Sequence, residues 1–157
     1  MIGILTVLVV VHTYFDIWHH LPAIASASGL GATGGAALTV ELWISLGIQV
    51  LVCGISLLVP LIARSHPEAV HFGWRCLSDY TANQRERIMP LLKRMMGLVS
   101  LAVSVFFAAE VHLRLRWAFE DPRRQLPIVW WAAGLAAICA AIIFYYLQRF
   151  DEEAGPE

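Results

Sequence analysis

The sequence predicts an all-α integral membrane protein, a bundle of four transmembrane helices with its N- and C-termini in the cytoplasm. Of its 157 residues, 59% are hydrophobic and only 15% are charged. The mean hydropathy is +0.66. These values are too apolar for an ordinary soluble domain of this length. The third observation is a set of four long apolar segments, each near the roughly 20 residues that cross a bilayer.

The predicted spans are residues 2–20, 42–63, 91–113 and 128–147. The second and fourth contain no charged side chain, and the third is uncharged from residue 95 up to Glu110. The first is interrupted by His12 and Asp16, and an aspartate at a helix centre costs roughly 2.5–3.5 kcal/mol. Ten strongly apolar residues in that segment, at about −0.3 to −0.6 kcal/mol each, still favour insertion. No Lys or Arg precedes the segment, so we expect a retained span rather than a cleaved signal peptide.

The distribution of Lys and Arg predicts the orientation of the helices. Residues 64–94 contain six of these basic residues, residues 114–127 contain four, and residues 21–41 contain none. Because positive residues concentrate on the cytoplasmic side, the loop at 64–90 is expected there. The chain is then expected to be a bacterial cytoplasmic (inner) membrane protein. Residues 1–150 form its single domain, and residues 151–157 form a short acidic tail.

The basic segment between the second and third spans also shows local order. Thr81 followed by Gln84 is typical of a capping box and predicts a helix that begins near Ala82. Pro90 is expected to kink or interrupt that helix. The charges of residues 64–94 fit either an anchor at anionic lipid or a docking surface for a membrane or cytoplasmic protein partner.

Other classes of function find less support in the sequence. The letters "GLGATG", residues 29–34, match the G-x-G-x-x-G pattern of dinucleotide-binding turns, but no preceding strand is predicted. We expect residues 21–41 to form a flexible or re-entrant outer loop. The net charge is −1 and the basic residues are confined to a few loops, so no basic face is predicted that could bind a nucleic acid. Three widely spaced cysteines form neither a disulfide framework nor a zinc motif.

Small and polar residues recur at helical spacing and predict the faces on which the helices pack. In the second span they are Ser45, Gln49, Cys53, Ser56 and Pro60. In the third they are Gly97, Ser100, Ser104 and Ala108, and in the fourth Ala133, Ala137, Ala140 and Ala141. These faces predict a compact antiparallel bundle that needs no cofactor to hold it together.

Polar residues within the spans are the candidate site: His12, Asp16, His19, Glu110 and His112. The first three share one helix face, and the carboxylates of the set lie at similar predicted depth near the outer surface. Imidazole and carboxylate groups could bind a divalent metal or pass a proton, and histidines could ligate haem. A structural polar seam between helices explains the same residues.

The geometry of the third span bears on the choice between a ligand or proton site and a structural polar seam. Glu110 and His112 point about 200° apart in a regular helix. His112 is the one expected to lean toward the small-residue face, while Glu110 is expected to pair with Arg114 one turn on.

The order of several segments resembles a known family. A first span that ends in "DIWHHLP" is followed by a small-residue loop, a second span that ends in "VPLIARSHPEAVHF", and then "LSDYTANQRERIMPLLKRMMGL". This order resembles the SdpI-like immunity and signalling proteins of bacterial membranes. Members usually carry a His-Phe pair in the first outer loop, whereas the pair here, His71 and Phe72, falls in the 64–90 loop. The resemblance implies protection against a secreted toxin and sequestration of a transcriptional repressor.

Together these observations predict a protein that is not an enzyme, because no nucleophile–base pair or phosphate-cradling loop is apparent. We expect a signalling, immunity or accessory role in the membrane, with the lipid bilayer as its first partner and oligomerisation left open. The alternative is an accessory subunit or small carrier that binds a divalent metal or haem, or relays protons, through the His/Asp/Glu cluster.

Overall fold

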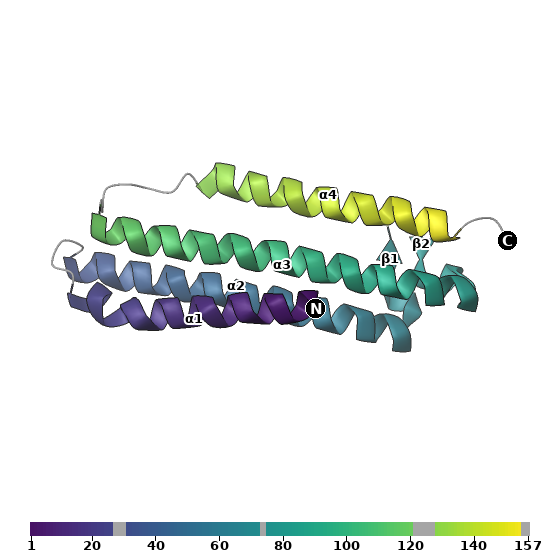
Figure 1. Cartoon of the computed structure of the whole chain (residues 1–157), viewed down its shortest axis with the longest axis horizontal. Coiled ribbons are helices and arrows are strands. Elements are labelled where there is room, and N and C mark those ends of the chain that lie inside the picture. Colours follow the sequence, from purple (N-terminus) through teal and green to yellow (C-terminus); the bar gives the residue numbers. More distant parts are fainter. Residues whose placement is uncertain (27–30, 73–74, 121–127, 155–157) are drawn as a thin grey trace.

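Four long helices dominate the computed structural model, which describes residues 1–26, 31–72, 75–120 and 128–154 (Figure 1). They are α1 (Ile2–Ser26), α2 (Gly31–Ser65), α3 (Ala82–Glu120) and α4 (Ile128–Ala154). Each contains a segment long and apolar enough to cross a membrane. The predicted all-α fold with four membrane-length helices is therefore confirmed. Many large apolar side chains remain exposed, as expected for helices that contact lipid.

Helix α3 is the centre of the arrangement. Helices α1 and α2 pack against α3 and against each other, whereas α4 packs chiefly on α3 and lies on its opposite side (Figure 1). The prediction of one compact four-helix bundle is wrong in this respect, because the structure is a three-helix bundle with a fourth helix docked on it.

The predicted alanine face of the fourth span is also wrong, since Ala133, Ala137, Ala140 and Ala141 are all exposed. Bulky side chains make the contact with α3 instead. Trp131 lies 5.4 Å from Phe106 of α3 between ring centroids, and Tyr146 and Phe150 are buried further along α4. Dispersion contacts from large side chains fill the space between these two helices.

The predicted outer loop, residues 21–41, is mostly helical and that prediction is wrong. Helix α1 continues through Pro22 to Ser26, and α2 already begins at Gly31. Glycine indicates loops in soluble proteins, but in membrane helices it is common where helices approach closely. A Cβ atom at Gly35 would lie 3.3 Å from the backbone carbonyl oxygen of Ile24, so glycine permits this approach. Gly29 lies outside the described residues.

The small-residue faces predicted for the second and third spans lie in the interior as expected. Gln49 and Ser104 are fully buried and Ser100 is nearly so. Gly97 packs on α1, where a Cβ atom would lie 3.3 Å from Ile2 Cγ2. Apolar clusters flank this polar middle; the one toward the C-terminal end of α1 contains Ile17, Ile24, Leu42, Leu46, Val111 and Leu115.

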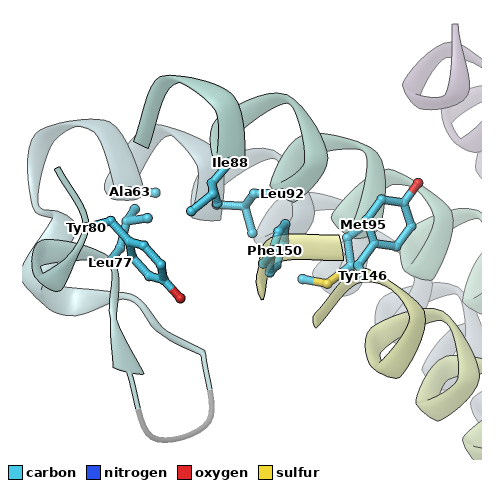
Figure 2. Packing of buried hydrophobic residues seen from close by; sticks show 8 residues of the cluster. All are labelled: Ala63, Leu77, Tyr80, Ile88, Leu92, Met95, Tyr146 and Phe150. Atoms are coloured by element: carbon cyan, nitrogen blue, oxygen red, sulfur yellow. The ribbon is translucent and has the colours of Figure 1, made fainter. Parts of the chain in front are cut away.

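The segment between α2 and α3 folds onto the ends of α3 and α4. It contains the short 3₁₀ turns Pro67–Ala69 and Leu77–Asp79 and a hairpin of β1 (His71–Phe72) and β2 (Arg75–Cys76). Figure 2 shows its anchor, a second apolar cluster made of Ala63, Leu77, Tyr80, Ile88, Leu92, Met95, Tyr146 and Phe150. The pKa of Glu68, in the same segment, is lowered below its usual value. The largest cause is a hydrogen bond with the backbone of Glu68 itself, and the second is the hydrogen bond with the side chain of His66.

The predicted capping box at the start of α3 is present. The Thr81 N–H donates to Gln84 Oε1 at 2.9 Å, and the Gln84 N–H donates to Thr81 Oγ1 at 3.4 Å. The helix begins at Ala82 as predicted, and it runs without a break through Pro90 to Glu120. Of the two outcomes expected at Pro90, a kink or an interruption, the interruption is wrong, which agrees with the tolerance of membrane helices for proline.

Candidate polar site between the helices

Asp16 of α1 lies between two histidines. Its carboxylate is 3.7 Å from Nδ1 of His112 on α3 and 3.5 Å from Nδ1 of His20 one turn along α1. The His20 ring also lies 2.8 Å from the backbone carbonyl oxygen of Asp16, so its Nδ1–H donates there. The Asp16 side chain is only 18% exposed, whereas that of His112 is 69% exposed. The contact between Asp16 and His112 connects α1 to α3.

Glu110 of α3 occupies the interior nearby. Its Oε1 accepts a hydrogen bond from Nε of Arg114 one turn on, at 2.9 Å, and the terminal nitrogen Nη2 of Arg114 lies 2.8 Å from the same oxygen in an ion pair. The Ser45 hydroxyl of α2 donates to the other oxygen at 3.5 Å. Arg114 also binds Glu41 of α2. The guanidinium group thus joins one carboxylate from each of two helices.

These five residues, Asp16, Glu41, Glu110, His112 and Arg114, form two separate sets of contacts between helices, Asp16 with His112 and Arg114 with Glu41 and Glu110, which we together call the interhelix ionic cluster. The pairing of Glu110 with Arg114 was predicted and is confirmed. The expectation that His112 leans toward the small-residue face is wrong, because Glu110 is 8% exposed and contacts that face through Ser45. The guanidinium group of Arg114 and the Ser45 hydroxyl compensate the burial of this carboxylate.

The remaining candidates lie apart from the cluster. His12 and His19 share a helix face with Asp16 in angle, but both are exposed on the outside of α1. The ring of His19 contacts the ring of His20 edge-on, with 5.5 Å between the ring centroids. Within the described residues, no group of three or more His, Cys, Asp or Glu side chains is placed to hold a metal ion. The structure does not assemble the five predicted ligands into one site.

Sequence reasoning missed Glu41 because it placed that residue at the end of a loop. The signal was present: Glu41 stands one turn before Ser45, and its carbonyl oxygen accepts a hydrogen bond from the Ser45 hydroxyl at 3.1 Å. Extending the second helix by one turn puts Glu41 on the face that meets α3.

A polar seam continues from the cluster through the centre of the three-helix bundle. Thr6 and Thr13 of α1 donate to the backbone carbonyl oxygens four residues earlier, at 3.1 and 2.9 Å. The side chains of Gln49, Ser100 and Ser104 are buried and make no hydrogen bond within the described residues. Each such group costs about 1–3 kcal/mol of desolvation. The buried polar side chains of the seam therefore lower the stability of the bundle. Their presence is explained either by the need for helices to approach closely or by a function.

Searches of family models, of curated proteins and of solved structures find no match to this chain.

Proposed function

We propose that this chain is a non-catalytic multi-pass protein of the bacterial cytoplasmic membrane that acts by binding, in a signalling, immunity or accessory role. The observation that carries the proposal is the interhelix ionic cluster. Glu110 is matched by Arg114, and Asp16 by His112 and His20. These polar groups join helices to one another, as expected for a scaffold with a structural polar seam. The SdpI-like order of segments agrees with such a role.

We further propose that residues 64–90 and both termini lie in the cytoplasm. The positive residues of that segment support this orientation. The ionic cluster lies at the opposite end of α3 and would then be near the outer surface. A protein partner in the cytoplasm would meet the segment anchored by Leu77 and Tyr80, which Figure 2 shows packed near the start of α3.

The experiment that tests the scaffold compares Asp16→Asn with His12→Gln. His12→Gln is the matched control, because both residues lie on α1, but His12 is exposed whereas Asp16 forms an ion pair with His112 of α3. Asp16→Asn should lower stability by about 1 kcal/mol, as for other interhelical polar contacts in membranes. His12→Gln should not. Growth of the source bacterium should be unaffected by either variant. Full stability of Asp16→Asn together with a lost cellular phenotype would refute the structural role.

A second candidate, an accessory carrier that relays protons, is favoured by one observation. Asp16 lies within 3.7 Å of histidine rings on two helices, and the polar seam continues inward through Ser104 and Gln49. Reconstituted vesicles that contain a pH-sensitive dye would test it. A proton flux that depends on the chain and disappears in Asp16→Asn supports the carrier. Equal flux for the variant and the unaltered chain excludes it. Elemental analysis and an absorption spectrum of the same preparation would test for a metal or haem.

A further inference from the structure

A hollow of about 780 Å³ lies at the end of the three-helix bundle that is remote from the ionic cluster. Its walls come from the start of α1, the second half of α2 and the first half of α3. Ile2 of α1 packs on Gly97, so the part of α3 before Gly97 extends past the start of α1. Figure 1 shows α2 and α3 continuing beyond that point. We call this hollow the α2–α3 groove.

The lining of the groove is apolar on one side and basic at its rim. Leu57 and Leu61 of α2 are each 59% exposed and form part of the apolar wall. Arg64, Lys93 and Arg94 line the groove, and no carboxylate does. None of these three cations makes an ion pair within the part of the chain that the structure describes. The groove therefore has an excess of positive charge beside an apolar surface.

A buried polar group reaches the floor of the groove. Ser100 is 2% exposed, lines the groove, and its hydroxyl has no hydrogen-bond partner within the described residues. A second hollow, of about 530 Å³, adjoins the first and shares Arg64 and Lys93 with it. Arg85 and Glu86 both line this second hollow, and Nε of Arg85 is buried with no hydrogen-bond partner within the described residues.

We propose that the α2–α3 groove binds one anionic phospholipid of the surrounding bilayer. The phosphate is held by Arg64 and Lys93, and an acyl chain lies along Leu57 and Leu61. Basic pockets between membrane helices on the cytoplasmic side recognise anionic headgroups, and the long side chains of Lys and Arg carry their charge to the headgroup level. The volume falls within the range of about 300–1,000 Å³ that is typical of small-molecule sites. A zwitterionic lipid would leave the excess positive charge less well compensated.

Native mass spectrometry of the full chain, released from an uncharged detergent, tests this proposal. The probes are phosphatidylglycerol and phosphatidylcholine with identical acyl chains at equal concentration. The unaltered chain should retain one phosphatidylglycerol in preference to phosphatidylcholine. Each cation near an anionic lipid contributes about fivefold to such a preference, so Arg64→Gln with Lys93→Gln should reduce it by about 25-fold. Arg87→Gln is the charge control, because Arg87 is exposed on α3 but does not line the groove.

A second pair of variants tests the path of the acyl chain. Leu57→Trp should fill the groove and weaken retention of phosphatidylglycerol, whereas Leu58→Trp should not. Both leucines are exposed on α2, and only Leu57 lines the groove. The proposal is overturned if the double charge variant keeps the preference of the unaltered chain. It is also overturned if either control acts as strongly as its partner, or if inorganic phosphate alone displaces the lipid.

Discussion

The ion pair of Arg114 and Glu110 leads to a quantitative prediction for stability. The side chain of Glu110 is 10% exposed and that of Arg114 is 17% exposed. In Arg114→Gln, the Glu110 carboxylate would remain in the interior with only the Ser45 hydroxyl, at 3.5 Å, as a donor. Removing one partner of a buried pair costs about 3–5 kcal/mol. Because Arg114 is partly exposed, screening by solvent reduces the expected loss to about 2–3 kcal/mol.

The same cluster contains its own controls. Glu41 also binds Arg114, but its side chain is 54% exposed, so Glu41→Gln should cost about 0–1 kcal/mol. Glu110→Gln combined with Arg114→Gln removes both buried charges, and the double variant should therefore be more stable than Arg114→Gln alone. Only an uncompensated carboxylate at position 110 explains a double variant that is more stable than a single one.

The assay is reversible unfolding in mixed micelles of an uncharged detergent and dodecyl sulfate, followed by circular dichroism. The free energy of unfolding is obtained for the four chains under one condition. A loss below about 1 kcal/mol for Arg114→Gln would place this pair with ordinary surface ion pairs. A loss equal to that of Glu41→Gln would show that burial of Glu110 has no energetic consequence, and the reasoning would be refuted.

Further predictions concern packing, capping and topology. Ser104→Leu should lower stability by about 1–3 kcal/mol through overpacking of a fully buried site, whereas Val105→Leu, which is half exposed, should have little effect in the same unfolding assay. Phe150→Ala should cost about 3–5 kcal/mol, since this ring is 1% exposed and joins α4 to α3; an unchanged midpoint would show that α4 is not held there. Thr81→Ala should cost about 1 kcal/mol by removing the cap of α3, measurable as a lower melting temperature. A cysteine in place of Ala82, in an otherwise cysteine-free chain, should resist an impermeant thiol reagent in intact cells, and labelling there would reverse the proposed orientation.

The sequence predicted the helices well because their signals are local or compositional. Four apolar segments of membrane length identify four helices, and the Thr81–Gln84 capping box locates the start of α3. The outer loop was predicted wrongly because glycine favours turns and loops in water. In this chain Gly35 instead allows α2 to approach the carbonyl oxygen of Ile24. Local preference was overridden by contact between two helices.

The candidate site was predicted only in part because its geometry depends on helix rotation. Periodicity shows that His12, Asp16 and His19 share a face, but it does not show which edge of that face meets a neighbouring helix. The structure turns Asp16 toward His112 and leaves the other two exposed. A similar rotation buries Glu110 rather than His112. The alanines of α4 were predicted wrongly for a related reason. Small residues at helical spacing do not show whether a neighbouring helix packs on that face.

The two ends of α3 perform separable tasks in this scheme. Lys93 at the groove and Glu110 in the ionic cluster are 17 positions apart, or about 25 Å at 1.5 Å per residue. Between them lies the polar seam, in which the buried hydroxyl groups of Ser100 and Ser104 form no hydrogen bond to any residue that the structure describes. Substitutions at such separation are expected to add within about 0.5 kcal/mol. Arg114→Gln should therefore lower stability without changing the preference for phosphatidylglycerol, and Lys93→Gln should change that preference at nearly constant stability. Strong coupling between these variants would mean that lipid in the groove and the ionic cluster at the far end belong to one switch.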